Sequence, residues 1–146
     1  MHTLDVRRTR RRRGVALRIL VVDDEVQVAR SIARLLRRHH YEVRTAHAGL
    51  EALAQLEGVA IVLTDLRMPG MSGVELALEV KRRAPEVRCC LMSGDGGALN
   101  ATPCEGIDRA SVMSSAIDAR LGKPFAHDDL LDVIARLARP RPQGTP

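Results

Sequence analysis

Five polar residues that suit metal and phosphate chemistry stand at or just after the ends of apolar runs in this sequence. They are Asp23, Asp24, Asp65, Ser93 and Lys123. Taken singly, each has an ordinary explanation, because an Asp or Ser after a strand often caps the next helix and a lone Lys is usually on the surface. Their shared position, after four of the five apolar runs, is much harder to explain by chance.

If these side chains meet, they form a set suited to phosphoryl transfer. Three carboxylates in one place repel each other, and Mg²⁺, which prefers oxygen ligands and keeps water and phosphate oxygens in its shell, would offset their charge. A lysine adds a positive charge and a serine adds a hydroxyl donor, groups that stabilise a phosphoryl group in transfer. Asp65, which precedes the turn-forming Met68-Pro69-Gly70, is the best placed nucleophile, and its product would be an acyl phosphate.

The elements around these residues alternate between two hydrophobic patterns. Continuous apolar runs predict buried strands, and apolar residues three and four positions apart predict helices. The predicted strands are residues 17–22, 41–46, 59–64, 87–92 and 119–121. The predicted helices lie within residues 28–36, 50–56, 74–83, 107–115 and 130–138. Strands that alternate with helices in this way are parallel and buried on both faces.

The alternation predicts an α/β fold, a doubly wound five-stranded parallel sheet with helices on both faces. In such sheets, ligands bind beyond the carboxyl ends of the strands. Because each of the five polar residues follows a predicted strand, we expect all of them at that edge. One domain of about 120 residues accounts for the pattern.

The composition indicates a folded domain with an aliphatic core. Hydrophobic residues make up 45% of the 146 residues, and Tyr41 and Phe125 are the only aromatic ones. No apolar run approaches about 20 residues, so no membrane insertion is expected. The N-terminus lacks the apolar segment of a secretory signal, and the spacing of Cys89, Cys90 and Cys104 fits neither a disulfide framework nor a zinc site. These features predict a cytoplasmic protein with reduced thiols.

The net charge of +5 comes from the N-terminus. Residues 1–14 contain six arginines and one aspartate, whereas the remaining residues contain 17 basic and 17 acidic ones. We expect residues 1–16 to form a disordered basic extension. Residues 1–14 are a candidate contact with nucleic acid through phosphate electrostatics. The alternatives are a solvated extension, or a start codon placed too far upstream.

The motifs at these positions resemble the receiver domain of two-component response regulators. They are Val21-Val22-Asp23-Asp24-Glu25, Leu63-Thr64-Asp65-Leu66-Arg67-Met68-Pro69-Gly70-Met71-Ser72-Gly73, Met92-Ser93-Gly94 and Gly122-Lys123-Pro124-Phe125. The resemblance covers roughly Arg18 to Ala138. It implies a flavodoxin-like fold with strand order 2-1-3-4-5, a receiver domain at residues 17–139 and a C-terminal tail at residues 140–146.

The resemblance also implies a role for each motif residue. Asp65 would accept a phosphoryl group from a sensor histidine kinase or phosphotransfer protein. Asp23, Asp24, Asp65 and the backbone carbonyl of Arg67 would bind Mg²⁺. Ser93 would donate a hydrogen bond to the phosphoryl group and Lys123 would pair with it. Pro124 stands where receivers commonly have a cis peptide bond, which would direct Lys123 into the site.

The sequence departs from the family pattern at two places. The span from Ser93 to Lys123 is longer by roughly eight residues, which we assign to residues 94–105, either a specialised partner surface or a tolerated insertion. Arg120 replaces the aromatic residue that usually reports phosphorylation, so we expect output through the long loop or a charge contact at Arg120. The resemblance also implies that Arg67 and Asp95 flank the path of the attacking water, where they could pair or be two independent solvated charges.

Other readings of the sequence remain open. A phosphatase of the haloacid-dehalogenase type needs a second Asp two residues after the nucleophile, where this chain has Arg67. A receiver that signals without phosphate, as a scaffold, stays an alternative, as does tethering to nucleic acid by the arginine-rich end. We expect a stand-alone receiver, not an enzyme beyond its own phosphorylation and dephosphorylation, with an unknown downstream protein partner and a homodimer as an open option.

Overall fold

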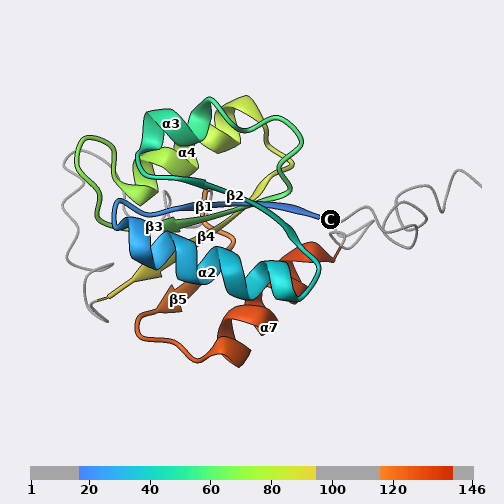
Figure 1. The fold of residues 1–146 in the computed structure, drawn as a ribbon. Helices are drawn as coiled ribbons and strands as arrows, with labels where there is room; N and C mark the ends of the chain where they lie inside the picture. Colours follow the sequence, from blue (N-terminus) through green and yellow to red (C-terminus); the bar gives the residue numbers. More distant parts are fainter. Residues whose placement is uncertain (1–16, 95–115, 140–146) are drawn as a thin grey trace, which may run out of the picture.

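The computed structural model describes residues 17–94 and 116–139, which form a five-stranded sheet and its covering helices (Figure 1). The strands are β1 (Arg18–Val22), β2 (Glu42–Ala46), β3 (Ile61–Asp65), β4 (Arg88–Ser93) and β5 (Ala119–Gly122). The helices are α2 (Val26–Arg38), α3 (Gly49–Leu53), α4 (Gly73–Arg83) and α7 (His127–Ala138). All strand pairs are parallel and the order is β2-β1-β3-β4-β5, which confirms the predicted fold class.

The register brings the carboxyl ends of the strands to one edge. Val22 of β1 pairs with Ala46 of β2 on one side and with Thr64 of β3 on the other. Across the rest of the sheet, Asp65 pairs with Met92, and Ser93 pairs with Gly122. The residues that follow these strands therefore meet along a single line.

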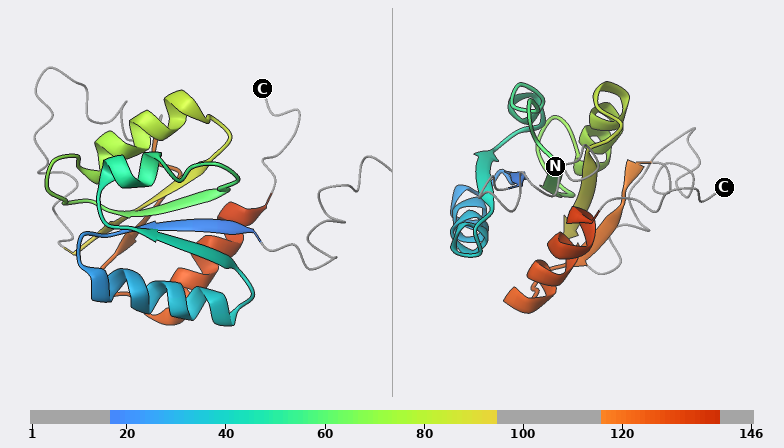
Figure 2. Two further views of the ribbon diagram at one scale, coloured as in Figure 1. Left: turned by 45° about the horizontal axis from the view of Figure 1, so that its top comes forward. Right: turned by 90° about the vertical axis from the view of Figure 1, so that its right-hand side faces the viewer.

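Two hydrophobic layers cover the sheet, one on each face (Figure 2). Helices α2 and α7 lie on the face that receives Ile19 and Val21, whereas α3 and α4 lie on the face that receives Leu20 and Val22. This split follows from the two-residue period of a strand, which sends successive side chains to opposite faces. Because both faces are covered, β1 is apolar from Ile19 to Val22 and β3 from Ile61 to Leu63, as their sequences predict.

The ends of helix α4 are fixed by local sequence signals. Ser72 caps the helix by accepting a hydrogen bond from the Glu75 amide, and the Glu75 carboxylate accepts one from the Ser72 amide. Three basic residues fill the last turn, where they complement the negative end of the helix dipole. Pro85 follows soon after, because proline cannot continue a helix.

The boundaries of the elements differ from the sequence predictions by one to three residues in several places. Strand β3 begins at Ile61 rather than at residue 59, because the amide of Val59 closes a turn onto the carbonyl of Leu56. Helix α3 ends at Leu53. The predicted helix at residues 107–115 lies outside the described residues. Within the described part of the chain, every helix is too short or too polar to cross a membrane.

A polar anchor ties the start of β4 to the start of β5 and to the end of α4. One carboxylate oxygen of Asp118 accepts hydrogen bonds from the ammonium of Lys81, at 2.7 Å, and from the amide of Cys89, at 2.8 Å. The Lys81 ammonium also donates to the carbonyl of Val87. The anchor lies at the amino ends of the strands, away from the edge that carries the predicted site.

Candidate functional site

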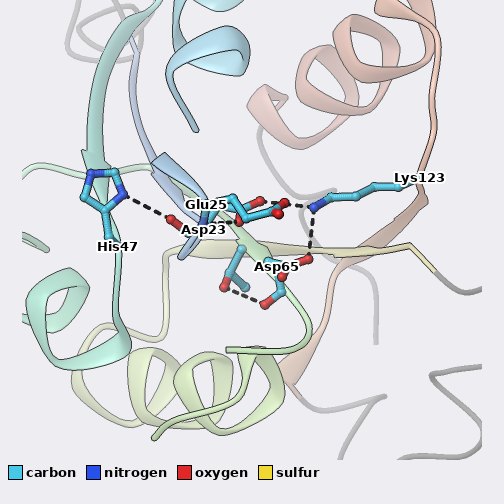
Figure 3. A network of polar contacts seen from close by, with 6 residues as sticks. Asp23, Glu25, His47, Asp65 and Lys123 are labelled. Atoms are coloured by element: carbon cyan, nitrogen blue, oxygen red, sulfur yellow. Dashed lines mark hydrogen bonds and ion pairs between the residues drawn. The ribbon is translucent and has the colours of Figure 1, made fainter. Parts of the chain in front are cut away.

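Three of the sequence-predicted residues meet directly at the carboxyl edge of the sheet (Figure 3). The ammonium of Lys123 lies 3.1 Å from Oδ2 of Asp23 and 3.1 Å from Oδ1 of Asp65. Asp23 follows β1, Asp65 ends β3 and Lys123 follows β5, so the contacts join three separate strands. Lys123 therefore bridges two carboxylates.

Asp24 completes a cluster of three carboxylates. One oxygen from each of Asp23, Asp24 and Asp65 lies within 4.8 Å of the other two. Asp23 is fully buried, Asp65 is partly buried and Asp24 is exposed. The cluster thus reaches from the interior to the solvent, which leaves one side open to a ligand.

The loop after Asp65 is held close against the strand that carries it. The Leu66 amide donates to the carbonyl of Met92, and the Gly73 amide donates to the carbonyl of Leu66. A Cβ atom on Gly73 would lie 2.2 Å from the backbone oxygen of Asp65, so only glycine fits there. Gly70 has a φ of +82°, a conformation that glycine adopts at little cost.

The turn after β1 is organised by hydrogen bonds to Asp23. Its Oδ1 accepts from the amide of Glu25 at 2.9 Å, in the manner of an Asx turn. Its own amide donates to the carbonyl of Ala46, and its carbonyl lies 3.0 Å from Nδ1 of His47. Asp23 is therefore fixed at its amide, its carbonyl and its carboxylate.

Lys123 is placed by strand β4. Its amide donates to the carbonyl of Ser93 at 2.6 Å, and the bond to Pro124 is cis, the geometry that the resemblance implied. The Ser93 side chain is buried at the end of β4, one strand away from Asp65. Ser93 and Lys123 thus flank the carboxylate cluster from the side of β4 and β5.

The charges of the site influence one another. Burial raises the pKa of Asp65, and the nearby Asp23 and Asp24 carboxylates raise it further, against the lowering effect of Lys123. Burial lowers the pKa of Lys123, but its hydrogen bonds and charge contacts with Asp23 and Asp65 outweigh burial, so its pKa is raised. The lysine is held in its charged form, whereas the cluster as a whole has more negative than positive charge.

The donor set fits a hard divalent cation. All three side chains offer carboxylate oxygens, the ligands that Mg²⁺ prefers, and they converge within the span of a single ion. Three carboxylates beside one lysine leave an excess of negative charge, which a divalent cation would offset. The exposure of Asp24 leaves room for the waters that Mg²⁺ retains.

The structure places the remaining predicted residues around this centre. Arg67 is exposed in the loop after Asp65, and Arg120 is exposed on the edge strand β5. Asp95, residues 1–16 and most of the long 94–105 segment lie outside the described residues. The sequence predictions missed two contacts at the site. The ring of His47 contacts the Asp23 carbonyl, and the Thr64 hydroxyl donates to the Asp65 carbonyl at 3.0 Å. No pattern in the sequence marks either residue.

Comparisons with known proteins agree with this geometry. The model of the response regulator receiver domain family matches residues 19–135. A transcriptional regulatory protein CpxR homolog from Haemophilus influenzae is 32% identical over 123 residues, which are 84% of this chain and 50% of that protein. The chain thus spans about half the length of that relative.

Solved structures give the same result. A response regulator receiver domain protein from Clostridium thermocellum matches with a TM-score of 0.71 at 29% identity, covering 83% of this chain and 93% of that one. Response regulator protein TrrA from Thermotoga maritima, in complex with Mg(2+)-BeF, matches with a TM-score of 0.70 at 30% identity, covering 83% and 98%. Both are similar in fold to this chain along nearly their whole length.

Proposed function

Because the chain belongs to the response regulator receiver domain family, we propose that it accepts a phosphoryl group on Asp65 and signals through that modification. Phosphorylation-dependent signalling in two-component systems is the typical role of this family. The donor would be a histidine kinase or a phosphotransfer protein, and Mg²⁺ would be the cofactor. We assign the receiver domain to residues 17–139, which include the matched residues 19–135.

One observation carries the proposal: Asp65 lies at the end of a central strand, in contact with a lysine and with two further carboxylates. A carboxylate that served only to cap a helix would not need a lysine and two further carboxylates beside it. Asp65 is 15% exposed at its side chain, so it is held by the fold but still accessible to a donor. The arrangement therefore combines a fixed nucleophile with an open approach.

The proposed reaction moves one phosphoryl group between two side chains. An oxygen of Asp65 forms a bond to phosphorus as the bond from phosphorus to the donor's histidine nitrogen breaks, and an acyl phosphate results. Lys123, already 3.1 Å from Asp65, would move from the carboxylate to the phosphoryl oxygens. The Ser93 hydroxyl would donate to another of these oxygens. Mg²⁺, held by Asp23, Asp24, Asp65 and the Arg67 carbonyl, would neutralise the charge that develops there.

Two cationic residues have proposed modulating roles. Arg67, two residues after Asp65, is exposed and would influence the approach of water to the phosphoryl group, alone or paired with Asp95. Arg120 stands on the edge strand β5, three residues before Lys123, where a charge contact would take the place of an aromatic switch. Output would then reach a downstream protein through contacts at this side of the sheet.

The test is an intact-mass measurement after incubation with a small-molecule phosphodonor and Mg²⁺. The expected result is one added phosphoryl group in the wild type, none after chelation of Mg²⁺ and none in Asp65→Asn. Asp132→Asn, on the exposed face of α7, is a matched control that changes the charge equally and leaves phosphorylation intact. A folded wild type that binds Mg²⁺ and shows no adduct, even in rapid-quench samples, would refute phosphorylation and favour the scaffold alternative.

A further inference from the structure

His47 makes a contact with the candidate site that the family motifs do not account for. It follows the last residue of β2, and its Nδ1 lies 3.0 Å from the backbone carbonyl oxygen of Asp23 (Figure 3). The ring is partly buried. The contact joins a residue outside the carboxylate cluster to the residue at its buried centre.

The contact replaces a backbone hydrogen bond that the ladder between β1 and β2 would otherwise supply. In the parallel ladder, Val22 pairs with Ala46, and the amide of Asp23 still donates to the Ala46 carbonyl. Continuing this register, the next donor to the Asp23 carbonyl would be the amide of Ala48. The chain leaves the sheet at this point, because Ala48 is the N-cap of α3, and the His47 ring supplies the donor instead.

The replacement matters because the carbonyl is buried. Asp23 is 0% exposed, and a buried carbonyl without a hydrogen-bond donor destabilises the fold. Relief of that cost would require the peptide between Asp23 and Asp24 to rotate toward solvent. Such a rotation changes ψ of Asp23 and φ of Asp24, the backbone angles that set how the two carboxylates are directed relative to Asp65.

The backbone of His47 is itself held by helix α3. Its backbone amide donates to Oε1 of Glu51 at 2.8 Å, which anchors it to the first turn of α3. A chain of hydrogen bonds therefore runs from α3 through His47 to Asp23 and on to Lys123. The contact with the Asp23 carbonyl requires a donor nitrogen at the distance of Nδ1 from the backbone, which a side chain of different length would not supply.

We propose that His47 is a positioning residue for the Mg²⁺ site: its Nδ1–H holds the Asp23 carbonyl and thereby aims the Asp23 and Asp24 carboxylates at Asp65. This inference rests on the proposed function, because that function includes the Mg²⁺ ion that the carboxylates would bind. His47 itself does not touch the metal or the phosphoryl group. Its donor, not its charge, carries the effect, since Nδ1 carries a hydrogen in the donating tautomer and in the cation alike.

The first measurement compares Mg²⁺ affinity across three variants of the full chain. In His47→Leu, which removes the donor and keeps the bulk, we expect binding about 5- to 10-fold weaker, the effect of one hydrogen bond of about 1 kcal/mol. In His47→Asn, whose amide nitrogen stands near the position of Nδ1, affinity returns to within about twofold of the wild type. His127→Leu, an exposed histidine at the start of α7, is the matched control and leaves affinity unchanged.

The second measurement needs no metal. In amide NMR spectra of the metal-free protein, the signals of Asp24 and Glu25 shift in His47→Leu and return in His47→Asn. A histidine that merely stabilises the loop would lower the unfolding temperature without this pattern. If the leucine variant does not fold, His47→Gln takes its place, because its amide reaches one bond too far.

The outcomes separate this inference from the proposed function. Wild-type Mg²⁺ affinity in His47→Leu, or unchanged Asp24 and Glu25 signals, overturns the role of His47 and leaves phosphorylation of Asp65 untouched. A wild type that neither binds Mg²⁺ nor forms an adduct refutes the proposed function and, with it, a metal-positioning role. Weaker Mg²⁺ binding in the leucine variant, restored by asparagine, supports both.

Discussion

Substitution of Gly73 by alanine tests how closely the loop after Asp65 must approach the strand. The new Cβ would lie 2.2 Å from the backbone oxygen of Asp65 and 2.7 Å from Cδ1 of Leu91. Ordinary contacts of this kind are longer by about 1 Å, so the start of α4 and the end of β3 must separate by roughly that much. The neighbour is backbone, which cannot rotate away as a flexible side chain would.

The expected cost follows from this displacement. Overpacking of a tight site costs about 1–3 kcal/mol, and a clash with backbone belongs at the upper end of that range. For a domain of this size, such a loss lowers the unfolding temperature by about 10 °C. The shift also moves Asp65, and because sites tolerate about 0.5 Å of misplacement, we expect Mg²⁺ affinity to fall by about tenfold or more.

Two other glycines supply the controls. Among the residues that the structure describes, a Cβ atom on Gly122 would meet no atom of another segment within 4 Å, so Gly122→Ala should leave stability and Mg²⁺ affinity within error of the wild type. Gly70 has open space but a φ of +82°, so Gly70→Ala should cost about 1 kcal/mol in stability with a smaller effect on the metal. The reasoning is refuted if Gly73→Ala unfolds at the same temperature as Gly122→Ala.

Three further changes probe the anchor, the thiols and the charge of the site. Asp118→Ala leaves the buried amide of Cys89 without its acceptor and should cost about 1–3 kcal/mol in urea unfolding, whereas Asp118→Asn keeps an acceptor and should cost less. Burial raises the pKa of Cys89 and of Cys90 to about 12, so with Cys104 replaced by serine neither thiol should react with iodoacetamide at pH 8 until the protein is unfolded. Because burial raises the pKa of Asp65, its protonated form stabilises the metal-free fold and this contribution is lost as pH rises through the folded-state pKa. Asp65→Asn should therefore unfold at a higher temperature than the wild type at neutral pH, and the difference should vanish below about pH 4 in a thermal scan.

The sequence predicts the sheet well because its signals are local. A continuous apolar run such as residues 59–63 specifies a buried strand on its own, and the alternation of strands and helices leaves few topologies. The edge of the sheet that carries Asp23, Asp65 and Lys123 follows from that topology alone, and the contacts among the three agree with it.

The contacts that support the site are harder to predict because they depend on register between distant segments. The donation from His47 to the Asp23 carbonyl requires knowledge of which residue of β2 lies opposite Asp23. The anchor between Asp118 and Lys81 joins residues 37 positions apart, and neither residue type is unusual at its position. Element ends are uncertain for a related reason, since the turn at Val59 competes with the strand for the same residues.

The contact between Lys123 and Asp23 has a consequence for the order of events during synthesis. The two residues are 100 positions apart in the chain, and the lysine follows the last strand of the sheet. The chain is synthesised from its N-terminus at about 5–20 residues per second. The three carboxylates are made well before the only cation that contacts them among the described residues. A nascent chain that stops before residue 123 would therefore contain all three acidic residues without the lysine that bridges two of them, so the charge balance of the cluster depends on completion of the last strand.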